Sequence, residues 1–215
     1  MVTVGVADTE APVRVLTLRL LPLCFEAELA RASVLRTLLF ALNDEDLDVR
    51  IAAVALVAKV APHNPAVVMP ILRRVLLQLV TDIGHFGASR QLDGSVRVLG
   101  GLLSVAAPLM APYTRAVLDV LRPKLDDPDP AVAAAVLRTA GALVDVGGVQ
   151  SADDVRALCP PLLAALSDPL CVHKRSAALG LLCKLVRASA QLQVVLEACP
   201  RLLPLLVSLL KSERE

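Results

Sequence analysis

An arginine phrase that recurs about every 40 residues is the feature that most restricts what this chain can fold into. In each copy, a small residue follows the arginine by three positions and an aliphatic residue follows it by six, as in Arg50, Ala53 and Leu56. The copies begin at Arg14, Arg50, Arg97, Arg138 and Arg175, with successive spacings of 36, 47, 41 and 37 residues. Residues three apart share one face of a helix, so each phrase indicates a helix that another helix approaches closely.

The segment 41–60 shows the unit that is repeated. An apolar helix end at Leu42 meets an acidic turn over residues 43–46, and a second helix begins near Val49. Two helices per unit at this period are the sequence signature of HEAT and armadillo solenoids, in which each hairpin packs only on its neighbours. The sequence therefore predicts an all-α chain folded as a right-handed alpha-alpha superhelix of the HEAT/armadillo type.

Residues that cannot continue a helix mark the turns between units, such as Pro62 and the pair Gly147–Gly148, and the turns within units, such as Pro128 and Pro169. They divide the chain, a single HEAT-repeat solenoid segment over 1–215, into about five repeats. The predicted boundaries are 1–29 (partial), 30–63, 64–108, 109–148, 149–189 and 190–215 (partial). A helix near 13–26 has no predicted partner before it, and one near 200–211 has none after it. We therefore expect a fragment cut within a repeat at both ends.

Composition excludes several classes of function. Hydrophobic residues make up 56% of the chain and aromatic residues only 2%, so the core must consist of Leu, Val and Ala, with few rings left to stack on bases. The formal net charge of +1 gives no field that attracts nucleic acid. The longest uncharged run, between Arg97 and Arg115, is broken by Pro108 and Pro112. We expect no nucleic-acid partner, no transmembrane segment and no secretory signal.

The cysteines do not form a recognisable metal or disulfide pattern. They are odd in number and lack a C-x-x-C pair, at positions Cys24, Cys159, Cys171, Cys183 and Cys199. We interpret them as reduced core thiols of an intracellular protein. Cys171-x-His173 is the one hint of a metal site, but the ligand spacing does not suit tetrahedral zinc. No metal site is predicted.

The sequence also lacks the motifs of catalysis. No G-x-S-x-G elbow surrounds a serine, and neither a P-loop nor a kinase glycine-rich loop, HRD or DFG occurs. The acidic turn 126–129 contains a proline and has no Gly-x5-Glu tail, so it is interpreted as a helix cap and not as a calcium loop. No catalytic residue and no cofactor is predicted for this chain.

The recurring arginines are predicted to hold neighbouring repeats in register, with ligand binding as the alternative. In HEAT repeats, an acid in the turn and an arginine six residues later can bond between repeats, and Asp8 with Arg14 and Asp44 with Arg50 have this spacing. The later copies have no acid six positions before the arginine: Gln91 precedes Arg97, Val132 precedes Arg138 and Pro169 precedes Arg175. In those repeats the arginine is predicted to anchor the register without an acid at that spacing.

Several phrases resemble the N-terminal HEAT region of target of rapamycin (TOR) kinases, members of the phosphatidylinositol-3-kinase-related kinase family. The phrases lie in the matching order at 4–8, 41–45, 64–73, 112–113, 126–130 and 202–211. The resemblance implies a Ser/Thr protein kinase in nutrient and growth signalling, with ATP and Mg²⁺ bound only in a kinase domain outside these residues. It implies a non-catalytic scaffold that binds TOR-complex subunits and contributes to dimerisation. It also implies a cytoplasmic location, with association to endomembranes or the nucleus.

Two other functions stay open on the residues alone. One is a free-standing HEAT adaptor of the importin or phosphatase-scaffold type, which the reading frame after Glu215 would distinguish from a kinase. The other is an enzyme of the HEAT-like lyase kind, which needs a cluster of acids or histidines on one face that the sequence does not show. The basic clusters Arg73–Arg74 and 173–175 are interpreted as solvated helix faces, with a partner-binding edge as the alternative.

Overall fold

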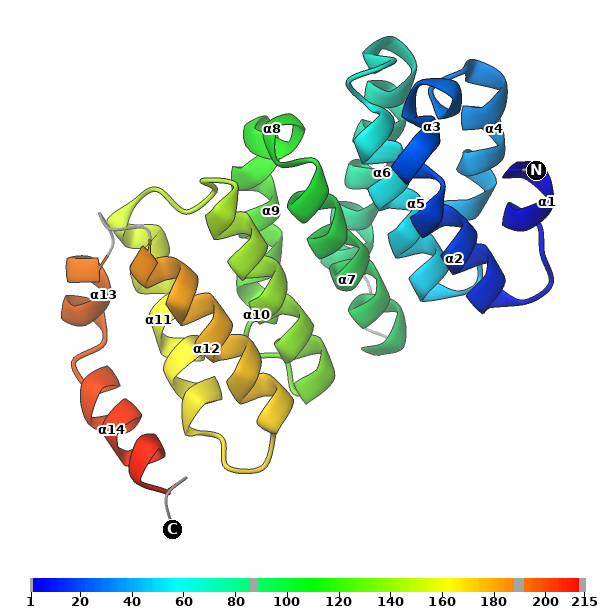
Figure 1. Ribbon diagram of the computed structural model, residues 1–215. Helices are drawn as coiled ribbons and strands as arrows, with labels where there is room; N and C mark the ends of the chain where they lie inside the picture. The colour runs from blue at the N-terminus through cyan, green and yellow to red at the C-terminus, as the bar shows by residue number, and fades with distance from the viewer. Residues whose placement is uncertain (1, 86–88, 188–191, 213–215) are drawn as a thin grey trace.

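The chain forms a single file of helical hairpins. The structure, a computed structural model, describes residues 2–85, 89–187 and 192–212. These residues form helices joined by turns, with no strand among them. Figure 1 shows the hairpins following one another in chain order, with the two termini at opposite ends of the row. The predicted all-α solenoid is confirmed.

The helix boundaries follow the turn residues. In chain order the elements are α1 (Val2–Val6), α2 (Ala11–Leu20), α3 (Pro22–Leu29), α4 (Ala32–Ala41), α5 (Leu47–Val60), α6 (Pro65–His85), α7 (Ser89–Val105), α8 (Ala107–Met110), the 3-10 turn η1 (Ala111–Tyr113), α9 (Thr114–Leu121), η2 (Arg122–Lys124), α10 (Pro130–Asp145), α11 (Ala152–Ser167), α12 (Val172–Arg187), α13 (Leu192–Ala198) and α14 (Leu202–Ser212).

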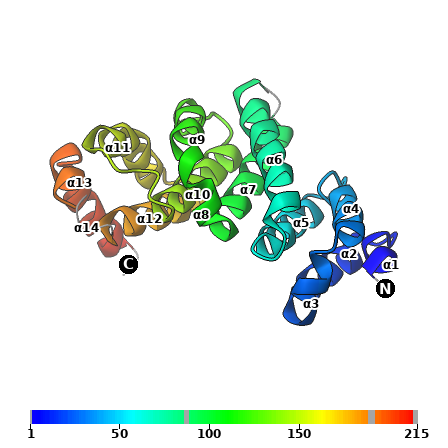
Figure 2. The ribbon, with the colours of Figure 1, turned by 90° about the horizontal axis from the view of Figure 1, so that it is seen from above.

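The hairpins stack so that the helices form two layers. The first layer contains α4, α6, α9 and α11, and the second contains α2, α5, α7, α10 and α12 (Figure 2). In the second layer each helix contacts the next one along the row, and Figure 2 shows this layer on the inner side of an arch. All five arginine phrases lie in second-layer helices. The repeat in the sequence therefore corresponds to the row of helices that pack most closely.

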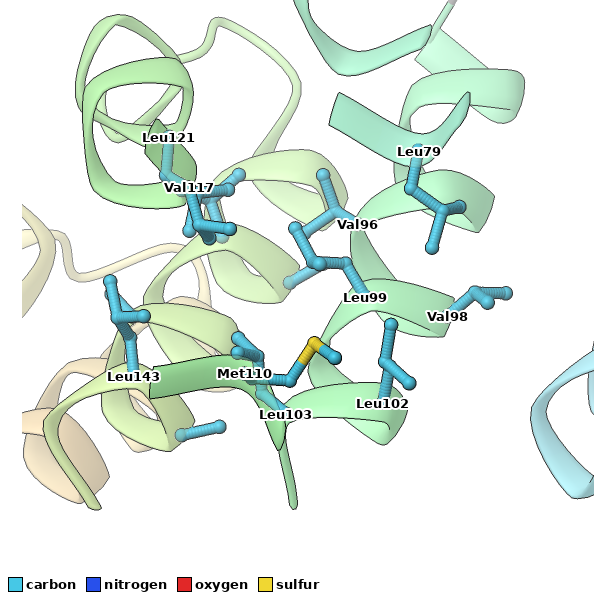
Figure 3. Close-up of a cluster of buried hydrophobic side chains, with 14 of the residues drawn as sticks. Leu79, Val96, Val98, Leu99, Leu102, Leu103, Met110, Val117, Leu121 and Leu143 are labelled. Carbon is cyan, nitrogen blue, oxygen red and sulfur yellow. The ribbon is translucent and has the colours of Figure 1, made fainter. Parts of the chain in front are cut away.

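The core is built from aliphatic side chains contributed by neighbouring hairpins. Around α7, Figure 3 shows Leu99 and Leu103 facing Met110 of α8 and Val117 of α9. These side chains are 1% exposed or less. Helix α10, which lies between α7 and α12 in the second layer, is buried along most of its length, because its run of alanines lets both neighbours approach closely. Burial of this kind stabilises each hairpin only in the presence of its neighbours.

Capping residues fix where the second-layer helices begin and end. The Asp46 carboxylate accepts hydrogen bonds from the main-chain N–H groups of residues 48 and 49, and Asp129 caps α10 in the same way at residue 131. Helix α10 ends in a Schellman motif: Gly147 has φ 77°, and the N–H of Gly148 donates to the carbonyl oxygen of Leu143 at 2.8 Å. The expected caps at Asp129 and Gly147–Gly148 are thus present.

The prediction of one helix over 13–26 is wrong in detail. The segment contains two helices, because Pro22 has no N–H to continue α2 and begins α3 instead. Within α3, Phe25 has the non-helical angles φ −133° and ψ 23°. A helix also precedes it: α1 packs against both α2 and α4. The expectation that the first arginine helix lacks a partner before it is therefore incorrect.

Prolines also divide the first helix of the fourth hairpin. The segment 107–124, at the start of the predicted repeat 109–148, consists of α8, η1, α9 and η2 in succession, with Pro108, Pro112 and Pro123 near the start of three of these pieces. Helix α13 has no counterpart in the sequence-based prediction. The repeat boundaries themselves stay predictions.

In the part of the chain that the structure describes, no single helix is long and apolar enough to cross a membrane, although the pair 90–105 and 107–124, bent by 111°, passes that test together.

Candidate functional site: contacts between repeats and the α6 groove

Arg14 of α2 links its own turn to the next turn along the row. Its Nη1 donates hydrogen bonds to the main-chain carbonyl oxygens of Asp8 at 2.9 Å and Thr9 at 3.1 Å. Its Nη2 donates to the Asp44 carboxylate at 2.8 Å, and the two side chains are only 8% and 12% exposed. Because Asp44 lies in the turn before α5, this guanidinium joins two successive hairpins.

The ionisation of Asp44 reflects this contact. Burial alone would raise the pKa of the carboxyl group. The hydrogen bonds from Arg14 and from the main-chain N–H of Asp46, together with the charges of Arg14 and Arg50, outweigh burial and lower the pKa below its ordinary value of 3.8. The hydrogen bond to Asp44 likewise raises the pKa of Arg14. The pair is therefore fully charged at neutral pH.

Arg50 of α5 repeats the main-chain contacts of Arg14 but not its contact with a carboxylate. Its Nη1 donates to the main-chain carbonyl oxygens of Asp44 at 2.7 Å and Glu45 at 3.2 Å. The acid six residues before each arginine thus offers its carbonyl oxygen and not its carboxylate. The Asp8 carboxylate instead accepts the main-chain N–H of Glu10. The sequence analysis expected a turn acid and an arginine to bond between repeats, and the structure places Arg14 against the carboxylate of Asp44 in the next hairpin.

The other three recurring arginines are placed differently. Arg97 lies 4.0 Å from Asp48 of the preceding hairpin and 3.7 Å from Asp93 on its own helix, and its side chain is 43% exposed. Arg138 is exposed and Arg175 half-buried, and neither forms an ion pair with any residue that the structure describes. Their contribution to the register of the later repeats stays a prediction.

A buried carboxylate that the sequence analysis did not single out joins the fourth and fifth hairpins. Asp154 of α11 is 6% exposed and accepts hydrogen bonds from Arg115 Nη1 at 2.9 Å and from Arg122 Nη2. It also forms a capping box with Ser151. Burial opposes ionisation, but the bonds from Ser151 and the two positive charges lower the pKa of Asp154 below 3.8. The spacing Ser151-x-x-Asp154 is the signature of a capping box and could have identified this carboxylate.

The thiols divide into buried and accessible ones. Cys159 and Cys199 are buried, and burial together with a hydrogen bond to Cys159 raises the pKa of Cys199 to about 12. Cys171 is half-buried, and Cys183 is exposed and so is not a core thiol. The Cys24 side chain lies outside the described residues. No group of three or more His, Cys, Asp or Glu side chains among the described residues could hold a metal ion.

The first layer is hollowed beside its longest helix. A groove of about 600 Å³, called here the α6 groove, separates α6 from the segment 110–113. Its lining residues are Met69, Pro70, Leu72, Arg73, Arg74, Leu77, Gln78, Thr81, Met110 and Tyr113. A second hollow of about 730 Å³ lies on the other side of α6, and its lining includes Asp44, Arg50 and Asp82. The α6 groove therefore combines apolar and basic side chains, while the second hollow carries both signs of charge.

The chain is similar to curated kinases over its whole length. It is 36% identical over 216 residues to the Serine/threonine-protein kinase tor1 of Schizosaccharomyces pombe, covering 100% of this chain and 9% of that protein. It is 33% identical over 221 residues to mTor of Drosophila melanogaster and 32% identical over 213 residues to TOR2 of Saccharomyces cerevisiae, again covering 9% of each. The chain thus spans less than a tenth of these relatives, and their kinase domain is not the part that matches.

Solved structures support the fold. An engineered protein aligns over 98% of this chain and 88% of its own length with a TM-score of 0.55 at 15% identity. A designed armadillo repeat protein aligns over 92% of this chain and 86% of its own with a TM-score of 0.51 at 17% identity. No family model matches the chain. The resemblance to TOR kinases and the repeat fold predicted from the sequence are both confirmed.

Proposed function

We propose that this chain is a non-catalytic scaffold segment of a TOR-type Ser/Thr protein kinase that acts in nutrient and growth signalling. The observation that carries the proposal is the similarity of the whole chain to a small part of much longer TOR kinases. In such a protein the solenoid offers surfaces for partner subunits and for dimerisation. ATP and Mg²⁺ bind in a kinase domain outside these residues. The protein then acts in the cytoplasm, in association with endomembranes or the nucleus.

The architecture suits a scaffold for a physical reason. Hairpins in single file expose a long surface, and the relative position of two binding patches on it depends on how firmly each joint is fixed. The Arg14–Asp44 contact connects α2 to the turn before α5, and the Arg115–Asp154 contact connects α9 to α11. These contacts support a fixed geometry at two of the joints. Partners bound at different hairpins would therefore be held at a defined separation.

The experiment that tests the proposal follows the reading frame beyond Glu215 in the transcript. We expect a kinase domain with its glycine-rich loop, HRD and DFG motifs downstream. A stop codon soon after Glu215, following a helix with a polar outer face, would instead support a free-standing HEAT adaptor and overturn the proposal. As a second measurement, the protein tagged at its own locus should co-purify with Ser/Thr kinase activity, with an untagged strain as the control.

A further inference from the structure

The exposed side of α6 presents an apolar strip that is continuous with two arginines. Leu77 is 54% exposed, although it is a large aliphatic residue in the middle of a helix. One turn before it lie Arg73 and Arg74, and all three line the α6 groove. Met110, in the floor of the groove, is fully buried and belongs to the core. The groove thus has an apolar floor and a basic wall.

The two arginines, Arg73 and Arg74, form no ion pair with a carboxylate that the structure describes. No acid lines the groove. Arg14 and Arg115 do have such partners, whereas Arg138 and Arg175 also lack one among the described residues, so it is the position of Arg73 and Arg74 on an apolar groove that sets them apart. The one acid of α6, Asp82, accepts a hydrogen bond from Gln78 at 2.7 Å and lines the second hollow, which Arg74 also lines, while Arg73 lines the α6 groove alone. The guanidinium groups of Arg73 and Arg74 therefore favour an occupant that carries negative charge.

The arrangement of the two guanidinium groups indicates what kind of anion fits. Successive residues of an α-helix are rotated by about 100° from one another, so adjacent arginines do not converge on one point. Two separate carboxylates along a peptide match this arrangement better than a single phosphate group, for which arginines that converge as a clamp are suited.

We propose that the α6 groove binds a segment of a partner protein in which large apolar side chains stand between acidic residues. The apolar side chains occupy the floor beside Leu77 and Met110, and the acids pair with Arg73 and Arg74. Methionine is flexible and polarizable, so the half-buried Met69 of the lining can adapt to different apolar side chains. This inference deepens the scaffold function proposed above and rests on it, since it states which partner chemistry one hairpin recognises.

The single tyrosine of the chain makes the site directly observable. The protein contains one Tyr and no Trp, and Tyr113 lines the α6 groove. Tyrosine emission of the 215-residue chain therefore reports on this groove alone. The probe is a synthetic peptide that contains neither Tyr nor Trp and has two central leucines flanked on each side by an aspartate and a glutamate. Its matched control replaces the acids by asparagine and glutamine.

We expect the acidic peptide to change Tyr113 emission in a saturable way. The dissociation constant of the amide peptide should be at least about tenfold higher. The double variant Arg73→Glu with Arg74→Glu should lose the response. Arg19→Glu with Arg36→Glu, which makes the same change of charge at exposed sites on α2 and α4, should keep it. If the charge-reversed protein does not fold by circular dichroism, Arg73→Gln with Arg74→Gln takes its place.

Equal binding of the acidic peptide to the Arg73/Arg74 variant and to the unchanged chain would overturn the proposal. A response to vesicles of phosphatidylserine and phosphatidylcholine, without one to the peptide, would overturn it in favour of a membrane surface. Failure of the peptide, while the tagged protein still co-purifies with kinase activity, would remove the groove proposal and leave the scaffold function standing. Loss of that co-purification would count against the scaffold function itself.

Discussion

The hydroxyl group of Thr139 on α10 donates a hydrogen bond to the main-chain carbonyl oxygen of Val96 on α7, 3.0 Å away in the interior. Gly100, one helical turn after Val96, leaves the space for it, because a Cβ at this position would lie 2.8 Å from the Thr139 Oγ1. Helices α7 and α10 therefore cross at a separation that a glycine permits. This crossing fixes the joint between the third and fourth hairpins.

Substitution at this crossing should destabilise the protein. We expect Gly100→Leu to lower the free energy of unfolding by about 1–3 kcal/mol, because the added side chain overpacks the contact with Thr139. The matched control is Gly180→Leu on α12, where a Cβ would meet nothing within 4 Å and no loss is expected. Thermal unfolding followed by circular dichroism measures both. An equal loss at the two positions would contradict a specific close approach at Gly100.

Gly141 should behave differently, although it occupies the same place in the arginine phrase. A Cβ there would lie 3.2 Å from Cδ of Lys184, a flexible side chain that pairs with Asp145 at 2.6 Å. The lysine can move aside, and the pair that it would lose is partly exposed and contributes about 0–1 kcal/mol. Gly141→Ala should therefore cost less stability than Gly100→Ala in the same melts. The reverse order would show that Lys184 cannot move.

This comparison indicates how far the sequence could predict the fold. The hairpins were predictable, because helical periodicity and turn residues such as Pro128 act locally. The close approach at Gly100 and the looser one at Gly141 have the same pattern in the sequence, since the difference depends on whether the facing residue is Thr139 or Lys184. That identity is set by the packing of helices distant in sequence, which a repeat period does not specify.

The contacts between repeats were predictable only in part, for a similar reason. An arginine six residues after an acid indicates a polar joint, but a guanidinium has several donors. In Arg14 some of them bind main-chain carbonyl oxygens and one reaches Asp44 of the next hairpin. The convergence of Arg115 and Arg122 on Asp154 left no trace in the repeat pattern, because it joins residues 39 and 32 positions apart.

The protein should lose stability in acid through Asp44 and Asp154. Both carboxyl groups have a pKa below 3.8 in the folded state, so the unfolded chain takes up protons at a higher pH than the folded one. Their stabilisation is therefore fully present above the unfolded pKa and is lost as the pH falls through the folded pKa. The melting temperature should therefore decrease as the pH is lowered through the range between these two pKa values. Asp44→Asn combined with Asp154→Asn should flatten that decline, and an unchanged slope would contradict the assignment.

The buried carboxylate of Asp154 should contribute more to the free energy of unfolding than that of its exposed neighbour Asp153. Asp154→Ala removes the acceptor of two arginines and leaves Arg122, whose Nε is buried without a hydrogen-bond partner among the described residues, further uncompensated. We expect a loss of about 1–3 kcal/mol in urea unfolding. Asp153→Ala is the matched control: that side chain is 89% exposed and pairs only with Arg156, so its loss should be about 0–1 kcal/mol. Similar losses for the two variants would show that the Asp154 contacts contribute little.

An apolar stripe along α12 should make the isolated chain self-associate. Val172, Leu179 and Val186 are 63%, 40% and 38% exposed, and their spacing of seven residues places them on one face of the helix. Exposed aliphatic residues that share one face of a helix offer apolar surface for another copy of the chain to cover. Static light scattering should therefore show an average mass that rises with protein concentration. Leu179→Glu with Val186→Glu should suppress this rise, whereas Ala164→Glu, an exposed site on α11, should not. A monomer at all concentrations, or equal suppression by the control, would show that this stripe does not drive association.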